Sequence, residues 1–275
     1  MDEKTILGID GDVLCYYACE KRYKVSQDGI LRIPLTHTGE RVQLEYTEEE
    51  DRFYMETVWY NFQTSLNDLQ EKLFCKDYVM AVKGPGNFRD LLYPEYKINR
   101  HSSDPTRRNL FVPALRKAAV AHGLAVASDG READDLLRIW ANEAKGAGVK
   151  FITCTIDKDL KCIPGMFYDM KHETLIEITE AMATRHYYEQ MLKGDPVDNI
   201  PGVPGIGNVK AEKILKSLQT EEEFQEAVVS HYIAAYDDEW FNQFLSNAKM
   251  IHLQRNPNDY FKASEWPILR ELVNA

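Results

Sequence analysis

Short apolar runs alternate with longer amphipathic segments through most of this chain. The runs have the length of buried strands and occupy residues 5–10, 78–82, 124–127 and 149–153. Between them, apolar residues recur at helical spacing over 13–20, 48–74, 110–122 and 133–144. Because strands and helices alternate, the pattern predicts a mainly parallel central sheet flanked by helices.

The pattern changes towards the C-terminus. Residues 166–170 and 175–178 predict a marginal strand pair, and from Glu180 onward the periodicity is helical. We therefore expect two regions, an α/β core over 1–178 and a helical region over 179–275.

Two segments interrupt the core pattern. Residues 23–46 alternate in the manner of strands around Thr38-Gly39, which predicts a hairpin. Residues 83–117 contain glycines and prolines that break the segment into loops and short helices. This second segment carries eight basic and three acidic side chains, a local net charge of +5. Its basic residues are Lys83, Arg89, Lys97, Arg100, Arg107, Arg108, Arg116 and Lys117.

Composition narrows the class of protein. Hydrophobic content of 44% and charged content of 28% are those of an ordinary globular protein. No apolar run approaches the roughly 20 residues that span a bilayer. Five cysteines without a Cys-x-x-Cys pair predict reduced core residues in a cytoplasmic protein and argue against a zinc site. The net charge of −11 does not exclude a nucleic acid partner, because the basic residues are concentrated in one segment.

Acidic residues follow two of the predicted strands. Asp10 ends the first strand, and Asp157 follows the strand at 149–153. In parallel sheets the functional crevice lies beyond the carboxyl ends of the strands. We therefore expect these two side chains to lie in one site.

Two further acidic groups belong with this pair. Glu132 and Asp135 share one face of a helical turn that also carries Asp134, and Asp195 and Asp198 stand three residues apart. Clustered like charges raise each other's pKa unless cations neutralise them. Carboxylate oxygens suit Mg²⁺, and a pair of such ions supplies phosphodiester hydrolysis.

Each acid taken alone also has a structural interpretation. Glu132 and Asp134 would favour the dipole of the helix that they begin. Asp157 could cap a helix, as could Asp195 with Pro196 at the first helical position. Asp12 fits a helix cap better than a metal ligand. Taken together, the acids favour a metal site.

A glycine-rich turn follows Asp198 and runs into a helix that carries lysines. Gly205-Ile206-Gly207 before a helix exposes backbone N–H groups, which bind phosphate without reading base sequence. The combination of metal and phosphate chemistry predicts an enzyme that acts on nucleic acid, or a protein that binds it.

Five segments follow one another along the chain: Ile9-Asp10-Gly11, Tyr96-Lys97-Ile98-Asn99-Arg100, Glu132-Ala133-Asp134-Asp135, Asp157-Lys158-Asp159-Leu160, and Gly194-Asp195 through Gly207. In this order they resemble the structure-specific 5′-nuclease family, which includes flap endonucleases, the 5′-nuclease domain of bacterial DNA polymerase I and bacteriophage 5′→3′ exonucleases. The segments cover nearly the whole chain, and the short length is most similar to a phage enzyme.

The resemblance implies two metal sites in a core similar to PIN domains. The implied first-site ligands are Asp10, Glu132, Asp134, Asp135 and Asp157. The implied second-site ligands are Asp159, Asp195 and Asp198. Both ions would be Mg²⁺, with Mn²⁺ as a substitute. Asp157 is expected to be catalytic.

The resemblance also implies the DNA contacts. Lys97 and Arg100 would contact the scissile phosphate at the base of a helical arch near 84–117, with Arg107 and Arg108 as further contacts. A helix-three-turn-helix motif would hold duplex DNA through Gly202, Gly205, Gly207, Lys210 and Lys213. Carbonyls of Val203 and Ile206 would bind K⁺. For Tyr93 and Tyr96 we favour packing under the arch over stacking on bases.

The implied activity is metal-dependent 5′→3′ exonuclease and flap endonuclease cleavage of DNA with 5′ flaps or 5′ duplex ends, in replication. Whether RNA–DNA hybrids are substrates and replication proteins are partners stays open. We expect a monomer in the cytoplasm, which would be that of the bacterial host if the gene is from a phage. Two positions depart from the family: Val82 stands where an acidic residue is usual, and Val209 where a basic residue is usual.

Two alternatives follow. One is a non-catalytic, structure-specific DNA-binding protein on a degenerate nuclease scaffold, which the missing acid at Val82 motivates. The other is a single-strand ribonuclease on a related acidic core, which the glycine turn disfavours.

Overall fold

The computed structural model describes residues 4–19, 24–25, 31–32, 48–98 and 111–273. Within these residues no helix is long and apolar enough to cross a membrane.

A six-stranded sheet forms the centre of the fold, in the order β5-β4-β1-β6-β7-β8. Its strands are β1 (Thr5–Asp10), β4 (Tyr78–Val82), β5 (Val126–Ala127), β6 (Lys150–Thr155), β7 (Gly165–Asp169) and β8 (Thr174–Ile178). All neighbours pair in parallel except β7 and β8, which are antiparallel. The chain adds strands first on one side of β1 and then on the other, so the strand order reverses between β1 and β6. Ligand crevices of such sheets lie at that reversal, beyond the carboxyl ends of the strands.

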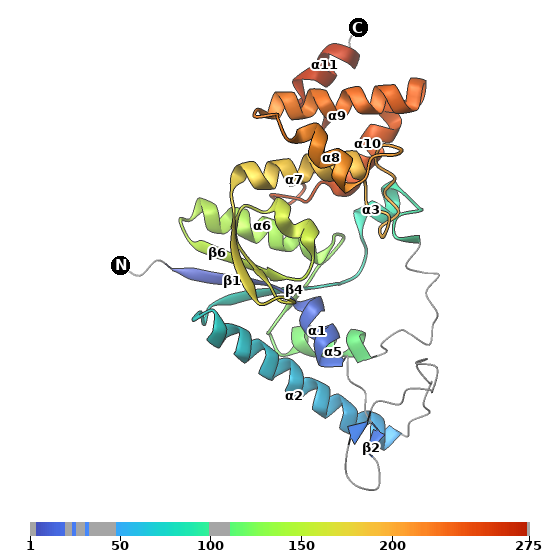
Figure 1. The fold of residues 1–275 in the computed structure, drawn as a ribbon. Coiled ribbons are helices and arrows are strands. Elements are labelled where there is room, and N and C mark those ends of the chain that lie inside the picture. The colour runs from blue at the N-terminus through green and yellow to red at the C-terminus, as the bar shows by residue number, and fades with distance from the viewer. Residues whose placement is uncertain (1–3, 20–23, 26–30, 33–47, 99–110, 274–275) are drawn as a thin grey trace.

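Helices cover both faces of the sheet (Figure 1). On one face lie α1 (Gly11–Cys19), α2 (Glu48–Lys72) and α5 (Phe111–Ala121), which pack against one another and share a core with β1 and β4. On the other face α6 (Ala133–Gly146) and α7 (Glu180–Lys193) enclose a second cluster around Leu137, Leu160 and Phe167. Both faces are apolar, which explains why the strands are continuous hydrophobic runs.

A helical region with its own core follows the sheet. Besides α7 it contains α8 (Asn208–Leu215), α9 (Glu221–Tyr236), α10 (Trp240–Ile251) and α11 (Pro267–Val273). Aromatic residues dominate its interior, including Tyr188, Tyr232, Phe244 and Trp266. Tyr96, from the connection after β4, is buried in the same cluster, so the two regions meet at this residue.

The predicted elements are confirmed, with ends shifted by a few residues. The strand at 124–127 contributes only Val126–Ala127 to the sheet. In the 23–46 segment the described pairing is antiparallel, between β2 (Lys24–Val25) and β3 (Leu31–Arg32), and the predicted turn at Thr38-Gly39 lies outside the described residues. All five cysteines are free, and four are buried, as predicted.

Candidate functional site

Asp10 and Asp157 lie at adjacent strand ends and are joined by one side chain. The Thr155 hydroxyl donates to Asp10 Oδ2 at 2.8 Å and accepts from the Asp157 backbone N–H at 2.9 Å. Asp10 also accepts from the N–H of Val13, and it is 7% exposed. The sequence prediction that these strands bring the two acids together is consistent with this geometry. Thr155 was not anticipated.

The start of α6 adds two more acids. Glu132 is the N-cap residue, and it exchanges capping-box hydrogen bonds with Asp135, three residues on. Asp134 lies in the first helical turn, where burial raises its pKa well above the usual value and the carboxylates of Asp10, Glu132 and Asp157 raise it further. The helix start therefore projects Glu132 and Asp134 towards the strand ends.

Asp135 points away from this group. It is fully buried and accepts two hydrogen bonds from Arg89, one from the Glu132 N–H and one from the Gln254 N–H. A carboxylate has about four lone-pair positions, and all four are engaged. This geometry does not favour the expected role of Asp135 as a metal ligand. Arg89 is also fully buried, so it adds no positive charge to the surface of the basic segment.

Lys97 and Tyr96 reach the acids from the end of the same segment. The Lys97 ammonium contacts Glu132 and lies 3.4 Å from Asp198 Oδ2, and its backbone N–H donates to the Asp198 carbonyl at 2.9 Å. The Tyr96 hydroxyl donates to Glu132 at 3.1 Å and lies 3.4 Å from Asp198 Oδ2. Burial raises the pKa of Glu132, but Lys97 and Arg89 outweigh it and lower the pKa below its usual value.

Asp195 and Asp198 stand on a tight turn that follows α7. Asp195 Oδ1 accepts from the N–H groups of Val197 and Asp198, and Asp195 pairs with Ile200 across the turn. The structural alternative for Asp195, a helix cap, does not apply, because the residues after it form a turn. Asp157 does cap a helix, the short 3₁₀ segment Lys158–Cys162, by accepting from the Asp159 N–H at 2.8 Å.

Asp159 joins the two halves of the cluster. Burial, the Asp157 carboxylate and the Asp195 side chain together raise the pKa of Asp159 to about 7. Burial and then Asp12 raise the pKa of Asp10 to about 7 against the lowering effect of Thr155. The site therefore concentrates carboxylates that repel one another, which is the condition that a bound cation relieves.

The donor chemistry fits hard divalent cations, although the side chains do not yet form a coordination shell. In the part of the chain that the structure describes, no three acidic, histidine or cysteine side chains are placed to hold one ion. Carboxylates from three separate segments nevertheless face the same strand ends with raised pKa values, those of Asp10, Asp134 and Asp159. Side-chain rotation would be needed to bring their oxygens into contact with an ion.

The raised pKa values predict how stability depends on pH without metal. An unfolded aspartate has a pKa of about 3.9, so between about pH 4 and pH 7 Asp10, Asp134 and Asp159 bind more protons in the folded protein than in the unfolded chain. They outnumber His186 and His252, whose lowered pKa values have the opposite effect on stability. The free energy of unfolding should therefore fall as pH rises through this window. We expect the melting temperature in EDTA to be lower at about pH 7.5 than at about pH 5, and Mg²⁺ to restore more stability at the higher pH.

Asp10→Asn is the control for this measurement, because it removes one group with a raised pKa. It should reduce the decrease in melting temperature between the two pH values. A melting temperature that rises over the window in EDTA would contradict the prediction.

The glycine turn is only partly available to a ligand. Gly202 is buried at φ +62°, against the backbone of Gly194, and its N–H donates to Asn247 while its carbonyl accepts from Tyr236. Gly202 therefore serves chain packing, and its N–H is not free for phosphate. Gly205 and Gly207 are exposed, and Gly207 is the N-cap of α8.

The other expected DNA and ion contacts near this turn lie around α8. Lys210 and Lys213 are exposed on α8. The Val203 carbonyl accepts from the Ile206 N–H at 3.1 Å, which closes the turn. Of the expected arch contacts, Arg100, Arg107 and Arg108 lie outside the described residues.

Asp12 differs from its expected role as a helix cap, and it lies close to Val82, the position where the family usually has an acid. Asp12 is not a helix cap: it lies inside α1, accepts from the Lys83 N–H and pairs with Arg116 at 2.7 Å. Val82, where the family usually has an acid, is fully buried at the end of β4. Asp12 thus places a carboxylate beside the residue that follows Val82.

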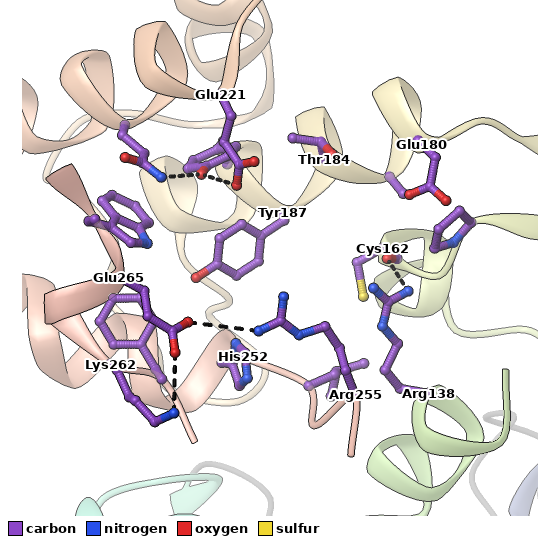
Figure 2. Close-up of a pocket in the computed structure, with 17 residues that line it drawn as sticks. Arg138, Cys162, Glu180, Thr184, Tyr187, Glu221, His252, Arg255, Lys262 and Glu265 are labelled. Carbon is purple, nitrogen blue, oxygen red and sulfur yellow. Dashed lines mark hydrogen bonds and ion pairs between the residues drawn. The ribbon is translucent and has the colours of Figure 1, made fainter. Parts of the chain in front are cut away.

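A cavity of about 240 Å³ lies elsewhere, between α6, α7 and the segment after α10. Figure 2 shows Arg255 reaching towards Glu265 and Arg138 bonded to the Cys162 carbonyl at 3.0 Å. Lys262 also pairs with Glu265. None of the expected metal or DNA residues lines this cavity, so we do not assign it a catalytic role.

Three comparisons with known proteins show what this chain is similar to. A family model described as the 5′-3′ exonuclease, N-terminal resolvase-like domain, matches residues 43–191. DNA polymerase I of Bacillus caldotenax is 35% identical over 237 residues, which are 81% of this chain and 24% of that protein. DNA polymerase I of Mycobacterium tuberculosis is 34% identical over 141 residues, 46% of this chain and 15% of that protein. The chain thus spans a quarter or less of these relatives.

Solved structures share the fold. The bacteriophage T5 5′-exonuclease with divalent zinc ions superposes with a TM-score of 0.53 at 14% identity, over 90% of this chain and 100% of that one. A variant of the T5 flap endonuclease in complex with DNA and metal ions gives a TM-score of 0.52 at 14% identity, over 90% and 99%. At this identity the likeness shows the fold.

Proposed function

The chain belongs to the 5′-3′ exonuclease family, and from this membership we propose that it is a metal-dependent 5′→3′ exonuclease with flap endonuclease activity on DNA. One observation carries the proposal: carboxylates from four segments lie near the strand reversal, at the end of β1, after β6, at the start of α6 and on the turn after α7. A protein that only binds DNA has no use for such mutual repulsion.

We assign the acids to two groups. Asp10, Glu132, Asp134 and Asp157 would hold one divalent cation. Asp159, Asp195 and Asp198 would hold a second. Bound there, Mg²⁺ or Mn²⁺ would supply Lewis acidity and an activated water for phosphodiester hydrolysis. The zinc and other metal ions bound to T5 relatives are consistent with this assignment.

Other residues would bind and orient the DNA. Lys97 stands beside the acids, where its ammonium could neutralise the scissile phosphate, and Arg100 follows in the sequence as a second contact. Gly205, Gly207, Lys210 and Lys213 would hold the duplex backbone, with K⁺ at the carbonyls of Val203 and Ile206. The arch near 84–117, the division at residue 178, monomeric state and RNA–DNA hybrids as substrates belong to the same proposal.

The test uses a 5′-labelled flap duplex and a matching blunt duplex, each incubated with EDTA, Mg²⁺ or Mn²⁺. The proposal expects cutting at the flap junction, or release of short 5′ products, only with metal. Tight binding without cleavage in either metal would instead favour a DNA-binding protein. Stronger cleavage of unpaired RNA than of flapped DNA would favour a ribonuclease.

A further inference from the structure

Arg89 is a fully buried arginine whose guanidinium makes four hydrogen bonds. Its side chain lies 4.5 Å from the centre of the Phe88 ring. Nη1 and Nη2 donate to the two oxygens of Asp135 at 2.7 and 3.0 Å. Nε donates to the Met250 carbonyl at 2.8 Å, and Nη2 to the His252 carbonyl at 2.7 Å. A lysine cannot make this planar set of bonds.

The partner carboxylate, Asp135, in turn holds the backbone of two other segments. It accepts the Glu132 N–H at 3.0 Å and the Gln254 N–H at 3.1 Å. Backbone groups of Met250, His252 and Gln254 therefore all form hydrogen bonds with this one ion pair. Three alternate residues, from the last turn of α10 into the segment after it, are thus held by the ion pair at the start of α6.

The anchoring extends to Glu132, a proposed metal ligand. Besides the Asp135 bond to its N–H, its carboxylate accepts from Asn87 Nδ2 at 3.1 Å, and Asn87 accepts the Arg89 N–H at 3.1 Å. Arg89 Nη1 itself lies 3.8 Å from Glu132 Oε2. A shift of Arg89 would therefore move both the backbone and the side-chain carboxylate of Glu132.

The same anchor reaches the glycine turn. Asn247, three residues before Met250 on α10, accepts the N–H of Gly202 at 3.3 Å. One short helix segment thus separates the turn proposed to hold duplex DNA from the ion pair that holds Glu132.

We propose that the Arg89–Asp135 pair is a positioning device that ties segment 250–254 and the glycine turn to the metal site, and that Asp135 binds Arg89 instead of a metal ion. The guanidinium acts as a permanent counter-charge for the carboxylate that lies deepest among the acids. This inference rests on the proposed function for its catalytic consequence, and on geometry alone for the anchor.

The first experiment measures Mn²⁺ binding by calorimetry, without DNA, for Arg89→Lys and Asp135→Asn. Partners that orient metal ligands typically contribute about 10- to 100-fold in metal affinity. We expect losses of that size with an unchanged number of bound ions, and a matching fall in kcat on the flap duplex. Asp157→Asn should instead reduce the number of ions. If Asp135→Asn also loses an ion, Asp135 is a ligand and the inference is wrong.

Arg138→Lys is the matched control, because Arg138 is a partly buried arginine on α6, the helix of Asp135, and also donates to a carbonyl. It lines the separate cavity of Figure 2. The variant should bind Mn²⁺ like the unaltered protein. Circular dichroism and melting curves would establish that all variants are folded. Affinity and kcat of Arg89→Lys equal to those of Arg138→Lys would overturn the positioning role.

Amide hydrogen exchange tests the anchor independently of metal and cleavage. Exchange over 250–254 should accelerate at least about tenfold in Arg89→Lys and stay unchanged in Arg138→Lys. Unchanged exchange in Arg89→Lys would refute the anchor even in an active nuclease. Faster exchange in a protein that cuts no DNA would retain the anchor and reject only the proposed function.

Discussion

Asp157→Asn is expected to reduce cleavage of a 5′ flap by about 1000-fold or more while leaving duplex binding within about twofold. The substitution removes one negative charge from a group of acids that would share two divalent cations, and a bound cation contributes several kcal/mol to catalysis. Asparagine keeps a side-chain oxygen that can accept the Asp159 N–H, so the cap of the 3₁₀ helix should persist. Single-turnover cleavage and fluorescence anisotropy with the same labelled duplex would measure both quantities.

Asp77→Asn provides the matched control, at the amino ends of the strands. Asp77 is exposed and precedes β4, far from the carboxyl ends of the strands. It should cut and bind like the unaltered protein. Near-normal turnover by Asp157→Asn would refute the assigned role, and loss of duplex binding would show that the residue supports the DNA surface instead.

The strand-end acids show what a sequence can predict about a site of this type. Asp10 and Asp157 each follow an apolar run, and parallel strands bring their carboxyl ends to one edge. Neither step needs knowledge of side-chain packing. The structure adds the strand order, in which β1 and β6 are parallel neighbours.

The buried ion pair shows what the sequence could not predict. Arg89 lies in a segment with a net positive charge, which suggested a surface for phosphate. Whether one arginine of such a segment turns inward depends on a carboxylate 46 positions away and on carbonyls more than 160 positions away. No local pattern encodes those contacts. The same applies to Gly202, whose contact with Gly194 arises only when the turn closes on itself.

Asp12 and Thr155 illustrate the same limit at shorter range. An acidic residue at the start of a helix is a typical N-cap. Asp12 instead accepts a hydrogen bond from Arg116 on α5, across the α1–α5 contact. Thr155 resembles any threonine of a buried strand. Its hydroxyl becomes important because β6 places it beside the last residue of β1.

Lys97→Met should have opposite effects on cleavage and on metal binding. Removal of a cation that neutralises the reacting phosphate typically reduces kcat by about 100- to 1000-fold. The Lys97 ammonium also lies between Glu132 and Asp198, one acid from each proposed metal group. Without it, the two carboxylates lose a competing positive charge, so we expect Mn²⁺ to bind as tightly or up to about tenfold more tightly.

The opposite signs separate two roles that a loss of activity alone would confuse. If Lys97 served only to hold Glu132 and Asp198 in place, Lys97→Met would weaken metal binding together with cleavage. Lys97→Arg keeps the charge and should restore part of kcat. Lys150→Met changes an exposed lysine at the amino end of β6, far from the acids, and should alter neither cleavage nor metal binding. Cleavage and calorimetry on the same three variants therefore decide whether this lysine acts on the phosphate or on the acids. Only a phosphate contact predicts that cleavage slows while the metal sites stay fully occupied.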